Sequence, residues 1–271
     1  MDALEELLQT GSVSRAAFLK KGVAAGAGLT LAAALPGSAL AALRGQTAAL
    51  TAGDVAILSA AEIAEALAVT TYTNIIHKAP FFRHLEDDDQ GYLKAARQEE
   101  MSHYLLEQGA TGKPSPAKAF YYPKGMFHDA RTTLNTLVTL EDAFIAAYLV
   151  GVRNFSTADL RVTAARIMGI ESDHRTLARV LGPNVAKRDG GPIERITGVQ
   201  GKAESVDPPN NNGYERTLLW TDINQALTAL GPFANKAEAA KAGFDTRKAY
   251  VFHPFTPKLP NPLGAFHSFA G

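Results

Sequence analysis

Two copies of a Glu-x-x-His motif are the part of this sequence best suited to chemistry. One motif joins Glu100 to His103, and the other joins Glu171 to His174. On an α-helix, residues three positions apart share a face about one turn apart, so each motif can direct a carboxylate and an imidazole to one point. Carboxylate oxygens and imidazole nitrogens suit iron, manganese or zinc. The two motifs therefore predict a metal site built on helices.

Two further glutamates extend this set. Glu65 and Glu141 each occupy a position that helical spacing otherwise fills with apolar residues. Carboxylates rarely face an apolar seam unless they are paired, and four together would repel one another, so two divalent cations would balance their charge. One Glu from each of two helices and a Glu-x-x-His from each of two others is the ligand set of a dinuclear centre in a four-helix bundle. The alternative is a plain bundle with Glu and His on its surface.

Two tyrosines follow the additional glutamates at the same spacing. Tyr72 comes seven residues after Glu65, and Tyr148 comes seven residues after Glu141. Each tyrosine therefore lies on the helix face of its glutamate, about two turns away. This weak repeat predicts two similar helix pairs related by a pseudo-twofold axis. We interpret Tyr72 and Tyr148 as candidate catalytic residues that hydrogen-bond near the ligands, with ordinary core packing as the other interpretation.

The elements that position these residues are four predicted helices. The spacing of apolar residues predicts them over residues 55–77, 87–108, 129–153 and 159–181, with Gly109 closing the second and Gly182-Pro183 ending the fourth. Short connections make the first two and the last two antiparallel neighbours. Residues 109–126 hold several Pro, Gly and Tyr without a helical period. We therefore predict an all-α four-helix bundle with one long crossover between its second and third helices.

The two ends of the chain differ from the bundle, which we place at residues 42–182. Residues 183–271 are predicted to be an extension that packs on the bundle or on a partner subunit. It has a helix over residues 214–230, a short helix over 235–242 and a Pro-rich extended tail over 253–263.

Residues 1–41 have the character of an export signal. The stretch Ser-Arg-Ala-Ala-Phe-Leu-Lys-Lys at 14–21 precedes an uncharged run rich in Ala, Gly and Leu, and 38–41 supply a small-x-small cleavage pattern. The stretch resembles a twin-arginine signal in which Ala16 stands at the second arginine. A Sec signal, a retained anchor and an ordinary N-terminal helix are the alternatives. We expect an exported protein of the periplasm or cell envelope.

Composition excludes several classes of function. Lys plus Arg, at 27, balances Asp plus Glu, at 27, so no basic field favours nucleic acid. The chain has no cysteine, which excludes disulfides, iron–sulfur clusters and Cys-bound zinc. Any metal must be held by His, Asp and Glu.

Other acidic and imidazole side chains do not fit the predicted site. Glu62, Glu99 and Glu107 fall off the best seam and are predicted to face solvent. Replacing Glu99 is therefore expected to leave metal content nearly unchanged, whereas replacing Glu100 should lower it. The remaining histidines have no ligand spacing and are predicted to be surface residues: His77, His84, His128, His253 and His267.

The complete pattern resembles the ferritin-like superfamily, which includes bacterioferritins, rubrerythrins and manganese catalases. Exported ferritin-like proteins of the desiccation-related type are most similar, because Ile57-Leu58 and the following Ala61, Glu65 and Tyr72 match their first helix. The resemblance covers residues 53–181.

The resemblance implies a role for each candidate ligand. Glu65 and Glu141 would be terminal carboxylates, Glu100 and Glu171 would bridge both metals, and His103 and His174 would each bind one. The cofactors would be two divalent iron or manganese ions.

The implied function is an oxidoreductase acting on O₂, H₂O₂ or Fe(II) in oxidative or desiccation stress. We expect the chain to form a homo-oligomer. The alternatives are a manganese catalase, a non-enzymatic metal-binding or stress-protective structural protein, and a storage cage.

Overall fold

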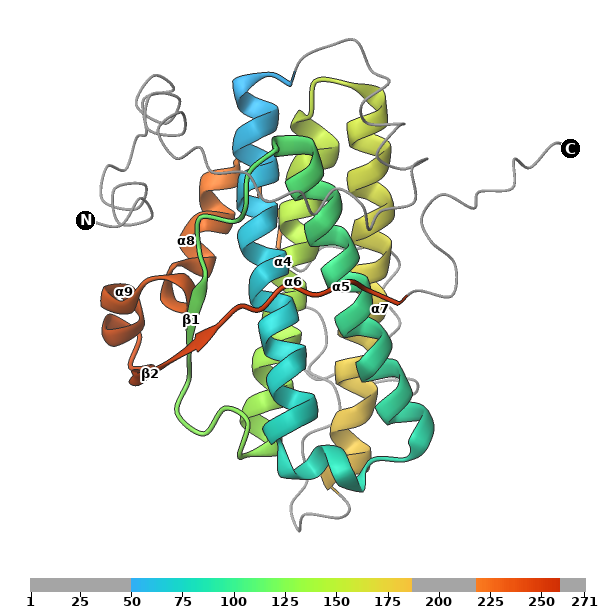
Figure 1. Ribbon diagram of the computed structural model, residues 1–271, viewed down its shortest axis with the longest axis vertical. Coiled ribbons are helices and arrows are strands. Elements are labelled where there is room, and N and C mark those ends of the chain that lie inside the picture. The colour runs from blue at the N-terminus through green and yellow to red at the C-terminus, as the bar shows by residue number, and fades with distance from the viewer. Residues whose placement is uncertain (1–49, 187–217, 259–271) are drawn as a thin grey trace, which may run out of the picture.

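Four long helices form the centre of the molecule. The computed structural model describes residues 50–186 and 218–258; the predicted export segment, the predicted helix start at Tyr214 and His267 lie outside this part. The helices stand side by side (Figure 1) and are α4 (Ala52–Lys78), α5 (Asp87–Thr111), α6 (Ala130–Asn154) and α7 (Ala158–Ala186). The predicted all-α bundle is confirmed.

The beginning of α4 is tied to the turn between α6 and α7. The Thr51 hydroxyl accepts a hydrogen bond from the Asp54 N–H at 3.1 Å, and the Asp54 carboxylate accepts one from the Thr51 N–H at 2.8 Å, which makes a capping box. The same carboxylate accepts bonds from the N–H and hydroxyl of Ser156 at 2.8 and 2.6 Å. Burial alone would raise the pKa of Asp54, but these hydrogen bonds lower it below its usual value.

Three predicted helix ends are wrong. α5 continues through Gly109 and ends at Thr111, where it is capped by Gly112, whose φ of 71° is the left-handed conformation that glycine adopts easily. α7 continues past Leu181 to Ala186, and the helix predicted to end at Leu230 is α8 (Ile223–Ala234), which contains Pro232. Proline has a φ that suits a helix and removes one N–H bond, so it is tolerated near a helix end.

The connection from α5 to α6 runs along the outside of the bundle. Residues 112–129 descend from the end of α5 to the beginning of α6 at the opposite end (Figure 1). Within it, β1 (Ala119–Tyr122) pairs antiparallel with β2 (Asp245–Val251), in a register that sets Ala119 opposite Val251. The sequence analysis predicted neither strand. The strand pair joins the connection to the C-terminal part of the chain.

The C-terminal part packs against the bundle. α8 contacts α4, α6 and β1. The short helix predicted over residues 235–242 is α9 (Lys236–Lys241), which is capped by Asn235. Beyond β2 the chain is extended and reaches α5, where the Lys258 N–H donates to Gln98 Oε1 at 2.8 Å. The Arg97 guanidinium lies 4.6 Å from the centre of the Phe255 ring. These two contacts lay the tail against α5 as far as Lys258.

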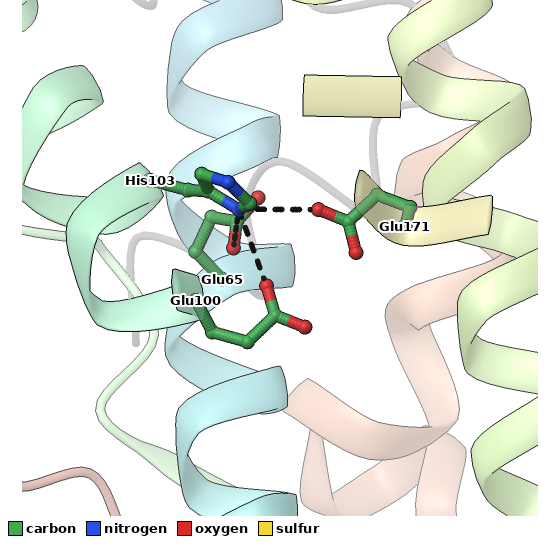
Figure 2. Close-up of side chains that lie close together, drawn as sticks. All are labelled: Glu65, Glu100, His103 and Glu171. Atoms are coloured by element: carbon green, nitrogen blue, oxygen red, sulfur yellow. Dashed lines mark ion pairs between the residues drawn. The ribbon is translucent and has the colours of Figure 1, made fainter. Parts of the chain in front are cut away.

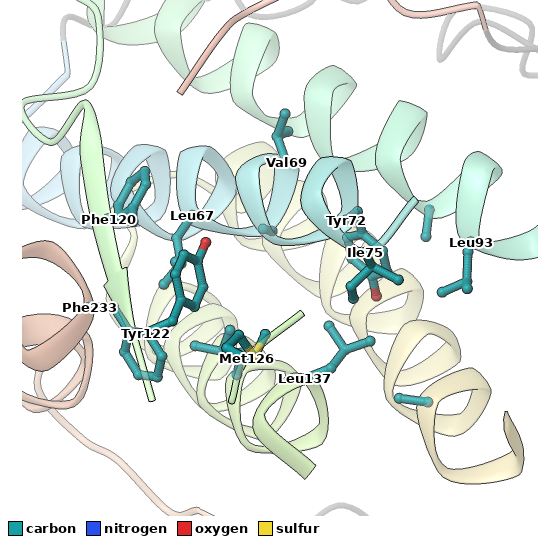
Figure 3. Packing of buried hydrophobic residues seen from close by; sticks show 14 of the residues in the cluster. Leu67, Val69, Tyr72, Ile75, Leu93, Phe120, Tyr122, Met126, Leu137 and Phe233 are labelled. Carbon is teal, nitrogen blue, oxygen red and sulfur yellow. The ribbon is translucent and has the colours of Figure 1, made fainter. Parts of the chain in front are cut away.

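Large apolar side chains from all four helices and β1 fill the main core (Figure 3). The 3₁₀ turn η1 (Pro80–His84) adds Phe81 and Phe82 to it. Burying one such side chain contributes about 1.5–3 kcal/mol, so this packing holds the helices at fixed spacing. The core includes Leu67, Tyr72, Leu93, Phe120, Tyr122, Leu137 and Phe233.

α6 is long and apolar enough to cross a membrane by length and composition alone. In the bundle, 56% of its apolar stretch is buried, and a helix in a protein core has the same length and composition.

Candidate metal centre

The six predicted ligands meet between the four helices. α4 supplies Glu65, α6 supplies Glu141, and α5 and α7 each supply one Glu-x-x-His pair. All six residues are at most 4% exposed. They form two overlapping groups of four whose ligand atoms lie within 4.8 Å of one another, and both groups contain the same two glutamates. The groups are Glu65, Glu100, His103 and Glu171, and Glu100, Glu141, Glu171 and His174.

The two shared glutamates each present one oxygen to each histidine. His103 Nδ1 lies 3.4 Å from Glu100 Oε2 and 3.2 Å from Glu171 Oε1 (Figure 2). His174 Nδ1 lies 3.0 Å from Glu100 Oε1 and 3.5 Å from Glu171 Oε2. A carboxylate placed in this way can bridge two ions, so the arrangement has the symmetry that the repeat predicted.

The remaining glutamates lie at the two ends of the site and bond to tyrosines. Glu65 Oε2 lies 3.6 Å from His103 Nδ1, and its Oε1 accepts a hydrogen bond from the Tyr148 hydroxyl. Glu141 Oε1 accepts a hydrogen bond from the Tyr72 hydroxyl at 2.6 Å. Each tyrosine therefore bonds to the glutamate of the other half of the repeat, and leaves Oε2 of that glutamate free to bind a cation.

The carboxylate oxygens and imidazole nitrogens of this site could bind a pair of cations. Within the described residues, six buried ligand atoms have no hydrogen-bond partner, although several lie within ion-pair distance without hydrogen-bond geometry. More than nine-tenths of buried polar groups in proteins are hydrogen-bonded, so such a concentration points to a ligand of another kind. Four carboxylates also match the charge of two divalent ions. The unpartnered atoms are Glu65 Oε2, Glu100 Oε2, His103 Nδ1, Glu141 Oε2 and both Glu171 oxygens.

Comparison with known proteins identifies the bundle. Residues 53–182 match the ferritin-like domain family. The bundle is a ferritin-like domain. No curated protein and no solved structure matched the chain. The predicted superfamily is confirmed, whereas the exported, desiccation-related subtype stays a prediction.

Burial and charge shift the protonation of the ferritin-like site. Burial, together with the nearby charges of Glu100 and Glu171, raises the pKa of Glu65 and of Glu141 well above the usual value. Burial opposes protonation of His103 and His174, but the surrounding carboxylates raise the pKa of both imidazoles. With no cation bound, these four candidate ligands therefore keep their protons up to a higher pH than the free side chains would.

Glu99 was predicted to face solvent, but its carboxylate also contacts His174. Its Oε2 lies 2.9 Å from Nε2 of His174, on the side of the ring opposite the ligand atom Nδ1. Its side chain is 37% exposed, so Glu99 lies near the surface, as its helical position predicted. The Nε2 atom of His174 contacts it at this position. A carboxylate in this position fixes the orientation of a metal-binding imidazole.

A Glu99→Ala substitution should therefore weaken metal binding without removing a ligand. Loss of such a supporting carboxylate costs about 10- to 100-fold in metal affinity. Competition with a chelator, monitored by bound metal per chain, would measure it. The matched control is Asp173→Ala, an exposed acid one residue before His174. Equal metal affinities for wild type and Glu99→Ala would contradict a supporting role for Glu99 and would show that it only faces solvent.

Glu62 and Glu107, also predicted to face solvent, are each only 1% exposed. Glu107 Oε1 is within hydrogen-bond distance of the Tyr148 hydroxyl oxygen, at 2.6 Å, and Glu62 Oε1 accepts a hydrogen bond from the Thr111 hydroxyl. Helical spacing could have found both, because Glu107 lies four residues after His103 and Glu62 lies three before Glu65.

The other half of the repeat has no counterpart of these two carboxyl groups. Four residues after His174 the chain has Ala178, and three residues before Glu141 it has Val138. The Glu65 side of the site is therefore more acidic than the Glu141 side.

The buried Glu62 should make folding depend on pH. Burial raises its pKa to about 7 from the usual 4.5, so the folded chain holds this proton more tightly than the unfolded chain. Stability therefore falls as pH rises from 4.5 to about 7, by roughly 3 kcal/mol for this group. In Glu62→Gln the loss of stability between pH 5 and pH 8 should be smaller than in wild type by about this amount, as urea unfolding at the two pH values would measure. Asp173→Asn, at an exposed acid, should behave like wild type; the same behaviour in Glu62→Gln would contradict the assignment.

The other described histidines lie away from the site. All four are exposed, as predicted, and His77 Nε2 lies 3.4 Å from an Arg97 nitrogen. They are His77, His84, His128 and His253.

Proposed function

We propose that the ferritin-like domain binds two divalent iron or manganese ions and acts as an oxidoreductase on O₂, H₂O₂ or Fe(II). The observation that carries the proposal is the division of carboxylate oxygens. Glu100 and Glu171 each direct one oxygen toward His103 and the other toward His174. A single ion would use only one side of this set, so the duplicated arrangement favours two ions bridged by two carboxylates.

Each group around the ions has a task. The six residues would hold the two ions, which would supply electron exchange with an oxygen substrate. Glu100 and Glu171 set the spacing of the two binding positions. The hydroxyls of Tyr72 and Tyr148 hold Oε1 of the terminal glutamates and so orient Oε2 toward the site. Glu99 holds the ring of His174.

The surroundings keep the site dry. Tyr72 is 0% exposed, and its ring packs edge-on against the His174 ring at 5.7 Å between centroids. Low exposure strengthens the electrostatic hold on the cations, and it limits side reactions with water.

Metal analysis followed by two assays tests the proposal. The full chain is purified without added metal, its bound metals are measured, and Fe(II) oxidation and peroxide disproportionation are then assayed. Two Mn per chain with oxygen release would support a manganese catalase, and two Fe with Fe(II)-dependent O₂ uptake would support a ferroxidase. A filled site that is inactive in both assays would contradict the oxidoreductase function and leave the metal a structural role, in which it ties four helices together.

We further propose that the protein acts outside the cytoplasm in oxidative or desiccation stress, and as a homo-oligomer. Support for export comes from the signal-like pattern of residues 1–41, which lie outside the described residues.

A further inference from the structure

A small cavity lies between the dinuclear site and the end of the bundle at which α4 begins. Its volume is about 20 Å³, which suffices for one molecule near the size of water. Side chains from all four bundle helices line it, together with Ile223 at the beginning of α8. Most of the lining belongs to a second apolar cluster, separate from the main core, that includes Leu58, Leu106, Phe155 and Leu160.

The cavity offers almost nothing to a polar occupant. Three lining residues carry polar side-chain atoms: Glu107, Tyr148 and Thr163. The Tyr148 hydroxyl is already bonded to Glu107 Oε1 and Glu65, and Glu107 Oε2, although it has no hydrogen-bond partner, is a single polar atom and is itself buried. The surface that faces the cavity is almost entirely apolar. A buried water needs two to four polar partners, so an apolar molecule fits this space better than water does.

The cavity is one side chain away from the proposed ligands. Tyr148 forms part of its wall and bonds to Glu65 at the same time. Ala110 and Ile223, two lining residues, are only partly buried and mark the side nearest the surface. An occupant would therefore sit between the surface and the Glu65 side of the site.

We propose that this cavity is a binding site for dioxygen on its way to the dinuclear centre. Dioxygen is small, uncharged and apolar, whereas hydrogen peroxide would have to give up hydrogen bonds to water to enter. The inference rests on the proposed function and narrows it, because it selects O₂ rather than H₂O₂ as the oxidant that approaches by this route.

Binding of dioxygen itself tests the site without any turnover, because the metal-free chain has no centre to consume it. Crystals of the metal-free full chain would be pressurised with O₂ and compared with crystals kept under N₂. We expect elongated density for one O₂ molecule against Tyr148 and Leu58 under O₂ only, and none there in Ala110→Leu. The matched control is Ala95→Leu, at an exposed position of the same helix. The same ordered water under both gases would overturn the proposal.

Oxygen kinetics test the route. The second-order rate of O₂ consumption by the metal-loaded protein should fall roughly tenfold in Ala110→Leu, as expected when an apolar pocket is filled, with metal content and the peroxide rate unchanged. A second filling variant, Ala61→Leu, should act in the same direction. An unchanged O₂ rate in both variants would overturn this inference alone, whereas no O₂ consumption by metal-loaded wild type would overturn the O₂ chemistry of the proposed function as well.

Discussion

A Glu100→Ala chain should lose both metal ions, whereas a Glu65→Ala chain should lose only one. Glu100 contributes an oxygen to each half of the site, at 3.4 Å from His103 and 3.0 Å from His174. Glu65 lies in the group around His103 only. Elemental analysis after dialysis against a weak chelator would measure the stoichiometry. The expected series is two ions for wild type, about one for Glu65→Ala and about none for Glu100→Ala.

Folding must be checked in these variants, because cavities are left where side chains are removed. Far-UV circular dichroism should show the same helix content in all three proteins. Asp173→Ala, within the second motif but exposed, should keep two ions. A folded Glu100→Ala chain that still binds two ions would show that Glu100 does not bridge.

Metal binding should release protons from the four candidate ligands whose pKa values are raised, because those protons must leave before a cation can bind. Those four are Glu65, Glu141, His103 and His174, whose pKa values are all raised. An indicator dye in weak buffer, during titration with Mn²⁺, would count the protons. Release should decrease as pH rises through the folded pKa values, and metal affinity should increase over the same range.

The effect of pH on the free energy of unfolding should differ between the metal-free and the metal-loaded chain. A raised pKa means that the metal-free folded chain binds more protons than the unfolded chain, so its stability falls as pH rises. Bound cations replace those protons, so the metal-loaded chain should not lose stability in this way. Release of one proton or none would contradict the protonation that burial and charge impose on the site.

The positions of the ligands were predictable because helical spacing determines which side chains share a face. Glu65 and Glu141 stood out as acids in apolar stripes, and each Glu-x-x-His pair falls on one turn. Glu62 and Glu107 were missed because the predicted set of buried positions on each helix was too narrow. A helix surrounded on several sides buries more than one seam: α4 buries both Glu62 and Glu65.

Other features depend on contacts between segments far apart in the chain. Glu99 is on the outer side of α5 by its own helix period, and only the approach of α7 brings His174 to it. The pairing of β1 with β2 joins residues more than a hundred positions apart. The crossing of Tyr72 and Tyr148 to the opposite glutamates likewise follows from the packing of α4 on α6. Local sequence patterns do not specify such pairs.

The most direct test of the dinuclear assignment is anomalous X-ray diffraction from the full chain loaded with Mn²⁺ or, anaerobically, with Fe²⁺. The predicted result is two anomalous peaks per chain, one beside His103 and Glu65 and the other beside His174 and Glu141, with Glu100 and Glu171 between them. A single peak, or peaks outside this group of six residues, would contradict it.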